Sequence, residues 1–525
     1  MPESPNRIVP LEQMLADAAR SLREFRELRA RDALCVEGNE LLSSTAAESF
    51  LAAFNLHGEY LTDAITLLTE ISTLDDPCLA EPGQRATFPR LIEQLSDSFD
   101  PEYGLLYDRA FAQMIDITRR LPKAAALNAA LLRFETGDAR SLLLRKARLR
   151  DPGKHLPTSA RGGVLKVLVL SRVTMGADVA ITSVVLHKAA SIFHNAERIL
   201  IGPAKTVELF GGDPTLRFLP ISYKSNGGLI DRLLNWLAIL EGVESEIAGL
   251  IEDQYVIIDP DSRLLQLGML PVVKGDARYF FFESRRWEDT FDDPMGVNTA
   301  KWLGQTFGDE IAILPAVWLR EADRRLGSDL VQRMRDSDGS SSTSRRQIAA
   351  ISFGNGGNSA KRAPDPFESS LLLRLLSSGV SVVLDKGYGE EEAQRAERLI
   401  DAAREKGYPV TVASETSAAD ITPEGARGKA WMLVWQGGIG TWAGLIAASD
   451  EFIGYDSAGQ HLAAALRVPL TDIFIEPSTA KFRSRWRPSG RGLIRIIDRA
   501  SQPVDPHQLV DDVMRARATP DTKSE

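Results

Sequence analysis

The sequence predicts an α/β protein in which two domains with parallel sheets follow an all-α domain. From about Leu11 to Arg150, apolar residues recur at helical spacing. Beyond that point, short apolar runs alternate with helical patterns, which is typical of strand-helix-strand units. A polar stretch from Asp336 to Ser344 divides this alternation, because its small polar residues cannot build a core. The length of 525 residues suits three domains of ordinary size, which we place at residues 1–160, 161–335 and 336–525.

The helical domain shows breaks at Gly58, at Pro77 and at Pro122. Residues 124–149 predict a helix, a tight turn and a second helix, but no clean repeat period is present. A loop rich in Pro, Gly and Ser ends the domain at residues 151–163. The domain carries no catalytic constellation, so we expect it to serve packing or to bind a partner protein.

In the first α/β domain, Val164 to Ser171 is a nearly continuous apolar run, as expected of a parallel strand buried on both faces. A helix is expected over residues 179–193, and further strands at 198–202, 254–259 and 278–283. The second α/β domain predicts strands at 347–353, 380–384, 408–413, 431–435, 452–455 and 469–474, the last of which is expected to end the sheet. Its helices are expected at 366–376, 391–406, 441–449 and 505–515, with one more starting near residue 460.

Bulk composition excludes several classes of protein. The net charge of −10 argues against nucleic acid as the main partner, because phosphate backbones need a basic footprint. Cys35 and Cys78 are too few for a disulfide framework, and the six histidines are scattered, which argues against a metal site. No signal peptide and no apolar run long enough to span a bilayer is visible. We therefore expect a cytoplasmic location, with peripheral contact at the inner face of the membrane left open.

The stretch from Asp450 to Leu466 predicts a buried strand, an acidic turn and a helix of small residues. Asp456 or Ser457 can cap this helix, and its remaining first-turn amides, with the helix dipole, suit a phosphate. In an open α/β sheet, ligands bind at such carboxyl ends of strands. The alternative is an aspartate that only caps a helix, with His461 packed beneath it.

A second stretch suited to phosphate is the glycine-rich loop from Phe353 to Pro364, which ends in Lys361 and Arg362. Glycines let backbone amides approach a phosphate, and the two cations can neutralise its charge. A surface turn without a ligand is the alternative interpretation.

Three motifs resemble glycosyltransferase family nine, the ADP-heptose:lipopolysaccharide heptosyltransferases. Residues 456–465 resemble the signature Asp-Ser/Thr-Gly-x-x-His-x-Ala-Ala, with Ala458 where the family has glycine. Residues 175–178, Met-Gly-Ala-Asp, resemble the Gly-Asp turn after the first strand, with Ala177 inserted. Residues 361–364 resemble Lys-x-Trp-Pro, with Ala363 in place of tryptophan. The resemblance spans about residues 164–490.

This resemblance implies the GT-B architecture, with two Rossmann-like domains that face each other across a cleft. It implies an inverting glycosyltransferase that moves a sugar, heptose in the family, from a nucleotide-sugar donor such as ADP-heptose to a hydroxyl of a glycan or glycolipid acceptor such as lipopolysaccharide core. The donor is a substrate, and neither a metal nor another cofactor is required.

The resemblance also implies residue roles. Asp178 would be the general base, the alternative being an N-cap aspartate of the helix from Val179. The donor-binding residues and their expected tasks are Lys361 and Arg362 on the diphosphate, the amides at Ser457, Ala458 and Gly459 beside it, Asp456 on sugar hydroxyls, His461 as support of the phosphate turn, and Glu390 on the ribose. For Glu390 the alternative is an acidic helix start.

Two other functions stay open. A nucleotide-sugar epimerase would suit the same architecture. A catalytically silent sugar-binding or scaffold protein is the alternative from another class, and the departures at Ala177 and Ala458 keep it open.

Overall fold

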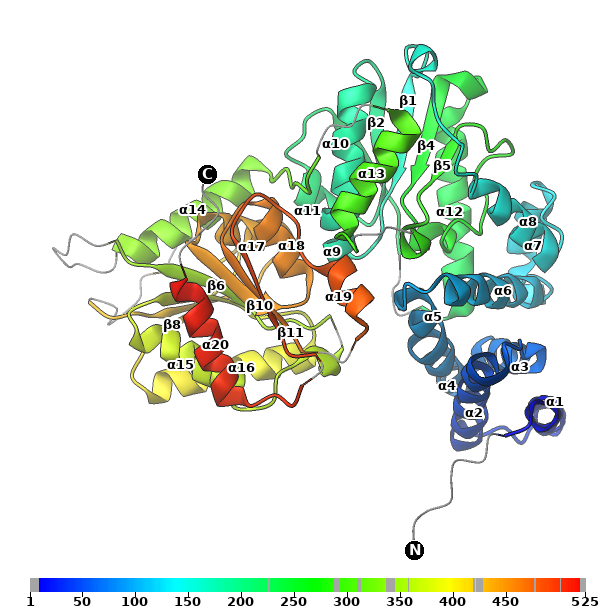
Figure 1. Cartoon of the computed structure of the whole chain (residues 1–525), viewed down its shortest axis with the longest axis horizontal. Helices are drawn as coiled ribbons and strands as arrows, with labels where there is room; N and C mark the ends of the chain where they lie inside the picture. Colours follow the sequence, from blue (N-terminus) through cyan, green and yellow to red (C-terminus); the bar gives the residue numbers. More distant parts are fainter. Residues whose placement is uncertain are drawn as a thin grey trace, which may run out of the picture. The chain divides into compact units, whose positions relative to one another are not determined.

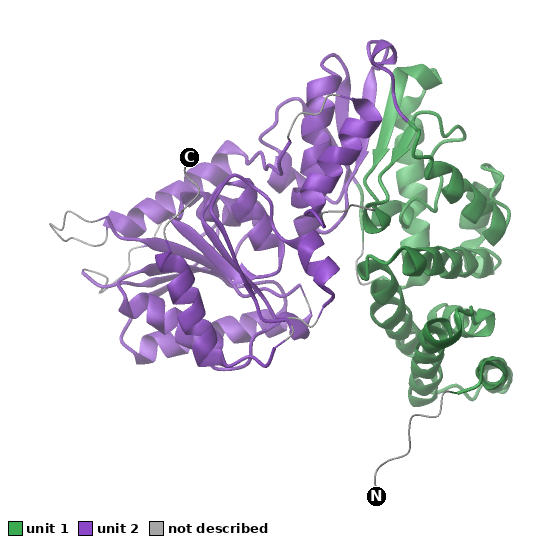
Figure 2. Ribbon diagram, viewed as in Figure 1, with its two compact units in different colours: residues 1–154, 221–288 green, residues 155–220, 289–525 purple. Residues whose placement is uncertain are grey.

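The computed structural model describes residues 9–223, 227–287, 292–308, 313–336, 345–356, 358–418, 421, 428–475, 478–500 and 502–519. The predicted linker at 336–344 lies outside these residues, apart from Asp336. The chain divides into two compact units, residues 1–154 with 221–288 and residues 155–220 with 289–525 (Figure 2). These limits differ from the domain limits expected above, and the division into three domains stays a prediction.

Helices fill the first 150 residues of the first unit, as the periodicity predicts (Figure 1). Capping residues explain where several begin: Asp100 accepts a hydrogen bond from the amide of Glu102 at the start of α6, and Asp138 and Ser141 form a capping box on α8. The helices are α1 (Leu11–Ala30), α2 (Val36–His57), α3 (Thr62–Ser72), α4 (Pro77–Arg85), α5 (Glu93–Asp97), α6 (Pro101–Thr118), α7 (Ala125–Leu132) and α8 (Ala139–Leu149), with a π-helical turn over Ala86–Ile92.

The first unit also contains α12 (Leu229–Ile247), β4 (Tyr255–Asp259) and β5 (Tyr279–Phe281). Every residue of these two strands is buried. Trp236 of α12 is fully buried, and its indole nitrogen donates to the carbonyl of Pro271 at 2.8 Å. The loops after β4 and β5 therefore start from buried strands.

The second unit begins with β1 (Lys166–Leu170), β2 (Glu197–Gly202) and β3 (Leu216–Pro220), which pair in parallel. The five-stranded sheet has the order β3-β2-β1-β4-β5. The sequence interpretation missed β3. The helices here are α9 (Met175–Ala177), α10 (Ser183–Ile192), α11 (Thr206–Phe210) and α13 (Met295–Phe307).

A seven-stranded parallel sheet has the order β12-β11-β10-β6-β7-β9-β8. The expectation that residues 469–474 end the sheet is wrong, because β11 pairs with β12 beyond it. Ile496 of β12 is 43% exposed, as is typical of an edge strand, and Arg495 interrupts the apolar run of this strand, which the sequence interpretation missed. The strands are β6 (Ile348–Ser352), β7 (Ser381–Asp385), β8 (Val410–Ala413), β9 (Met432–Trp435), β10 (Glu451–Tyr455), β11 (Leu470–Phe474) and β12 (Ile494–Asp498).

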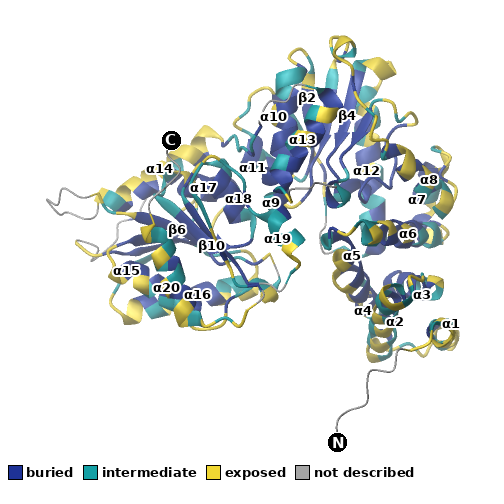
Figure 3. Ribbon diagram, in the orientation of Figure 1, coloured by how far each residue is buried: buried dark blue, intermediate teal, exposed yellow. Residues whose placement is uncertain are grey.

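Helices pack on this sheet, and its inner strands β6, β9 and β11 are buried throughout (Figure 3). They are α14 (Glu321–Asp336), α15 (Phe367–Ser377), α16 (Glu390–Glu405), α17 (Ile439–Ala448), α18 (Ala458–Ala465), α19 (Ala480–Trp486) and α20 (Pro506–Ala518). α14 packs on α17 at two glycines: a Cβ on Gly327 would lie 2.6 Å from the amide nitrogen of Leu445, and closer still to the carbonyl of Gly444. The predicted fold class, two parallel α/β sheets preceded by a helical region, is confirmed.

Candidate functional site

The carboxyl ends of β6, β7 and β10 lie side by side in the seven-stranded sheet. The glycine-rich loop follows β6, and the acidic turn follows β10. Parallel strands place the loops at their carboxyl ends on one edge, where open α/β sheets bind ligands. The two stretches that the sequence predicts for phosphate binding therefore meet at one edge.

Lys361 and Asp456 connect these two loops. The ammonium nitrogen of Lys361 lies 3.0 Å from Oδ2 of Asp456 and 3.2 Å from its carbonyl oxygen. Oδ1 of the same carboxylate accepts from the side-chain amide of Gln460 at 2.5 Å. Both carboxylate oxygens are therefore engaged away from the backbone of the helix.

The expectation that Asp456 or Ser457 caps α18 is wrong. Ser457 occupies the N-cap position, but neither side chain accepts from the first-turn amides. The Asp456 carboxylate points to Lys361 and Gln460 instead. Among the described residues, the start of α18 thus has backbone N–H groups without a side-chain cap, next to a lysine ammonium, and both favour an anion.

Ala458 and Gly459 form the first turn of α18. A Cβ on Gly459 would lie 2.5 Å from Cζ of Phe452, a buried residue of β10. The glycine is therefore needed for close packing between this turn and its own strand.

His461, in the first turn of α18, is buried, with 5% of its surface exposed. Burial lowers its pKa to about 4, since desolvation outweighs the opposing attraction of Asp456. Its ring meets Trp486 edge to face, with 6.1 Å between the centroids. A neutral, packed imidazole supports the turn mechanically and brings no positive charge to it.

Gly176, in the turn after β1, lies against this helix. A Cβ at Gly176 would be 3.2 Å from Cδ2 of His461 and 3.4 Å from Cα of Ala458. The Met175–Ala177 segment and the start of α18 thus make van der Waals contact within one unit. The structure brings together the two stretches that the sequence predicts for opposite sides of a site.

The Asp178 side chain, however, does not face that contact. It is fully buried, and its carboxylate accepts hydrogen bonds from Oγ of Ser171, the backbone amide of Arg172 and Oγ1 of Thr182, at 2.7 to 3.0 Å. Burial raises its pKa, and these three hydrogen bonds oppose the rise. This is the geometry of a residue that fixes the loop after β1.

The helix type changes locally where the Asp178 side chain points into the protein. Residues Asp178–Thr182 form a π-helical turn between α9 and α10. A π turn holds one residue more than an α turn, so it can absorb a single insertion such as Ala177. The helix begins at Met175, so Asp178 is not the N-cap that the alternative interpretation expected either.

Arg362 contacts different partners from those of its neighbour Lys361. Its guanidinium pairs with Asp365 and lies 3.3 Å from Oε1 of Glu368, which also binds Arg395. Arg362 is therefore neutralised on the α15 side, and Lys361 alone of the two predicted cations contacts Asp456.

Glu390 stands in the first turn of α16 and is exposed, with Gln394 as its hydrogen-bond donor. Glu392, two residues on, accepts from the amides of Asn355 and Tyr388 at 3.0 and 2.7 Å. Glu392 thus ties the glycine-rich loop to the loop after β7, while Glu390 makes no contact with either loop that the structure records and is exposed at the start of α16.

Two acidic residues escaped the sequence interpretation. Asp472 of β11 is fully buried, its two carboxylate oxygens have no hydrogen-bond partner among the described residues, and burial together with Asp456 raises its pKa well above the ordinary range. Asp385 ends β7 and accepts from Ser352 and Gly387, and burial raises its pKa to about 6. A lone acid inside or at the end of an apolar run is the signal that identifies both.

Neither a protein-family model nor a curated protein matches the sequence. Among solved structures, the chain is similar to a glycosyl transferase family 9 protein from Veillonella parvula, at 13% identity and a TM-score of 0.46, over 68% of this chain and 98% of that one. It is also similar to E. coli ADP-heptose lps heptosyltransferase II, at 15% identity and a TM-score of 0.42, over 67% and 98%. E. coli heptosyltransferase WaaC with ADP matches at 14% identity and a TM-score of 0.41, over 67% and 100%.

Two further observations concern the described residues only. They contain no group of three or more His, Cys, Asp or Glu side chains arranged to hold a metal ion. None of their helices is both long enough and apolar enough to cross a membrane.

Proposed function

We propose that this protein is a GT-B glycosyltransferase that moves a sugar from a nucleotide-diphosphate donor to a hydroxyl of a glycan or glycolipid acceptor. Heptose, carried by ADP, is the sugar that the motif resemblance favours, and lipopolysaccharide core is the corresponding acceptor. The observation that supports the proposal most is the Lys361 ammonium beside the uncapped start of α18, at the carboxyl edge of a parallel sheet.

In this proposal the diphosphate lies between Lys361 and the first-turn amides of Ser457, Ala458 and Gly459. Negative charge grows on the diphosphate as the glycosidic bond breaks, and a fixed cation and oriented amides stabilise it without reorganising. Asp456, whose carboxylate accepts from the side-chain amide of Gln460, holds the ammonium in place, and Asp456 is the proposed acceptor for sugar hydroxyls. Glu390, exposed at the start of α16, is the proposed ribose ligand.

An inverting transfer needs a base for the acceptor hydroxyl, and Asp178 stays the predicted one. Its carboxylate would have to leave Ser171 and Thr182 and turn toward the contact at Gly176. This required movement distinguishes two roles for Asp178, that of a base and that of a residue that fixes the loop. A base that reorients would lose turnover on change to Asn, whereas a loop-fixing residue would lose stability.

The buried, fully engaged Asp178 carboxylate favours a second candidate, a catalytically silent protein that binds nucleotide sugars. Both candidates share the Lys361 site, so nucleotide binding does not separate them. An epimerase on the same architecture would change the donor without an acceptor.

The experiment is a thermal-shift screen against a panel of nucleotide sugars and free nucleotides, followed by product analysis with and without glycan acceptors. We expect ADP-sugars to raise the melting temperature, and transfer only when an acceptor is present. Donor conversion without acceptor would favour the epimerase, and binding without conversion the silent protein. No stabilisation by any nucleotide or nucleotide sugar would contradict the proposal.

A further inference from the structure

A groove lies on the helical region of the first unit, where α1, α3, α6 and α8 form one face. α1 packs on α3, α3 packs on α6 and α6 packs on α8, and Figure 1 shows the four helices in this order. The volume of the groove is about 560 Å³, which is within the range of clefts that bind ligands. None of the described residues around Lys361 lines it, so the groove is a surface separate from the proposed nucleotide site.

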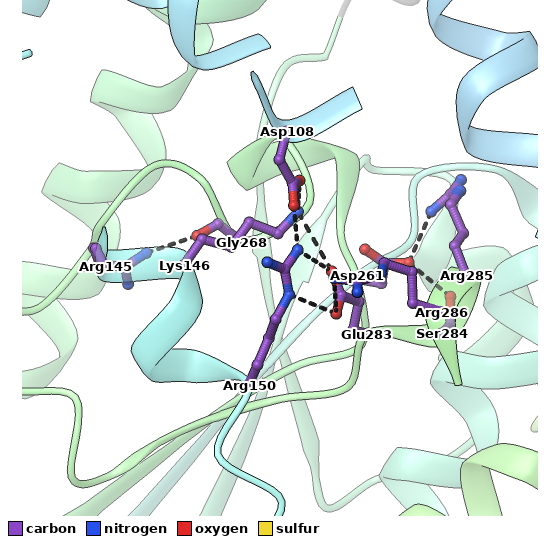
Figure 4. Close-up of polar contacts among 10 residues, drawn as sticks. All are labelled: Asp108, Arg145, Lys146, Arg150, Asp261, Gly268, Glu283, Ser284, Arg285 and Arg286. Atoms are coloured by element: carbon purple, nitrogen blue, oxygen red, sulfur yellow. Dashed lines mark hydrogen bonds and ion pairs between the residues drawn. The ribbon is translucent and has the colours of Figure 1, made fainter. Parts of the chain in front are cut away.

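A buried ion network holds the α6 and α8 walls of the groove in place (Figure 4). Asp108 of α6 contacts the ammonium of Lys146 in α8 and the guanidinium of Arg150 at the end of that helix. Arg150 also donates two hydrogen bonds to Glu283, of 2.8 and 2.6 Å. The network therefore ties both helices to the segment that follows β5.

Hydrogen bonds between side chains join α3 to α6 at the floor of the groove. The hydroxyl of Tyr60 donates to Oε1 of Gln113 at 2.8 Å. Nε2 of Gln113 donates to the carbonyl oxygen of Thr62 and to the hydroxyl of Thr66, both at 2.9 Å. The Tyr60 ring meets the buried Phe50 ring edge to face, with 5.1 Å between the centroids. The Tyr60 ring is therefore held at its hydroxyl and at its edge.

Arg109 of α6 lies on this ring. Its guanidinium carbon is 4.1 Å from the centroid of the Tyr60 ring, which is a cation–π contact. Among the residues that the structure describes, it forms no ion pair with a carboxylate. Arg109 is exposed, and a guanidinium presents its N–H donors in a planar fork that matches a carboxylate. The groove thus contains a positioned cation that keeps its full charge.

The other charges on the wall are paired. The groove is lined by three arginines, Arg26, Arg109 and Arg120, and by one carboxylate, on Glu70. Nε of Arg26 lies 3.1 and 3.2 Å from the two carboxylate oxygens of Glu70. Arg120 pairs with Asp116, one helical turn before it, which does not line the groove. An acidic group in this groove therefore belongs at Arg109, and the two paired arginines oppose a second cation there.

An apolar strip lies further along the same helix face. Arg109, Gln113 and Ile117 follow one another at intervals of four residues, so they share one face of α6. Ile117 is joined on the wall by Ala139 and Leu143 of α8, and all three are half-buried. Eight residues of α-helix span ~12 Å. A ligand that uses both places must carry its acidic and apolar groups about this far apart.

These two anchors suit a peptide better than a small anion or a glycan. In an extended chain, ~12 Å is spanned by about four residues. A small anion would reach only the arginine. A sugar ring would find no open aromatic face on the wall, because Arg109 covers the Tyr60 ring. Acidic motifs bound by arginines, with apolar side chains in a groove between helices, are a recurring form of peptide recognition.

We propose that this groove binds an acidic segment of a partner protein. An Asp or Glu carboxylate of the segment lies on Arg109, and an apolar side chain about four positions away packs on Ile117 and Leu143. This function of the helical region goes beyond the glycosyl transfer proposed above and does not depend on it, because the groove and the Lys361 site share no residue.

The test selects a phage-displayed library of random linear peptides on the immobilised full-length protein. We expect the native protein to enrich peptides with Asp or Glu about four positions from Leu, Ile or Val. Arg109→Gln should lose this enrichment, and Arg109→Glu should enrich Lys or Arg at the acidic position. A reversed preference cannot arise from a folding defect. The matched control is Arg148→Gln, at an exposed arginine of α8 outside the groove, which should select as the native protein does.

Calorimetric titration of the most enriched peptide, made synthetically, then measures the contribution of the arginine. We expect a loss of about tenfold or more in affinity with Arg109→Gln, because a charge-assisted pair is lost, and less than a twofold change with Arg148→Gln. Enrichment of basic or neutral peptides by the native protein would overturn the proposal. So would equal affinity of the two variants, or the absence of any enriched class of peptide.

Discussion

The ammonium of Lys361 lies 3.0 Å from the carboxylate of Asp456, where β10 ends and α18 begins. The two residues are 95 positions apart and come from different strand-helix units. The pair is only partly buried, with 20% and 10% of the side chains exposed, so a ligand can reach the ammonium. Asp456 therefore holds the Lys361 ammonium beside the start of α18, where an anion would be stabilised by both the ammonium and the helix amides.

We expect Asp178→Asn to lower the free energy of unfolding by ~1–3 kcal/mol, because the amide nitrogen of Asn would face one of the donors that the carboxylate now accepts from. Urea denaturation measures this, with the exposed Asp231→Asn as a control. Affinity for ADP should stay within twofold. Unchanged stability would contradict a loop-fixing role for Asp178, and abolished turnover would support its proposed role as the base.

The effect of Asp385→Asn should depend on pH. Burial raises the pKa of Asp385 to about 6, so the folded protein prefers its protonated form and loses stability as pH rises from about 4 to 6. Asn cannot ionise and keeps an acceptor for the amide of Gly387. We therefore expect the free energy of unfolding of Asp385→Asn, measured relative to the native protein, to be ~1–3 kcal/mol more favourable at pH 7 than at pH 3.5.

Denaturation curves at pH 3.5, 5 and 7 test this, and Asp401→Asn, at an exposed position of α16, is the control. If the stability difference between Asp385→Asn and the native protein stays constant across this range, the pKa of the Asp385 carboxyl group is not raised.

Gly327→Ala should destabilise the second unit. The new methyl would overlap the backbone of Gly444 and Leu445, so α14 would have to move away from α17. We expect a loss of ~1–3 kcal/mol in the free energy of unfolding, as is typical of overpacking. Ser328→Ala, at the next and exposed position, should have little effect. A Gly327→Ala protein as stable as the native one would mean that the two helices are not in close contact.

The fold could be predicted where local signals are strong. The apolar run at Phe452–Tyr455 and the small residues after Ser457 predict β10 and α18, because buried parallel strands and tight helix packing need those residue types. Edge strand β12 was missed, because Arg495 breaks its apolar run, although the other edge strand, β8, was predicted at residues 408–413.

Side-chain partners were less predictable than elements. Sequence proximity suggested that Lys361 and Arg362 act together, but the two neighbours point to different partners, Asp456 and Glu368. The direction of Asp178 depends on a π turn that follows a one-residue insertion, and hydrophobic periodicity does not report it. Buried Asp472 and the groove at Arg109 depend on contacts between distant segments.

The most direct test of the account is a calorimetric titration of ADP into the native protein and into Lys361→Met, with Lys406→Met, an exposed lysine after α16, as the control. We expect saturable binding to the native protein and to the control, and a loss of tenfold or more with Lys361→Met, because the diphosphate would lose its nearest fixed cation. Equal affinity of all three proteins, or no binding to the native one, would contradict a diphosphate site at the start of α18.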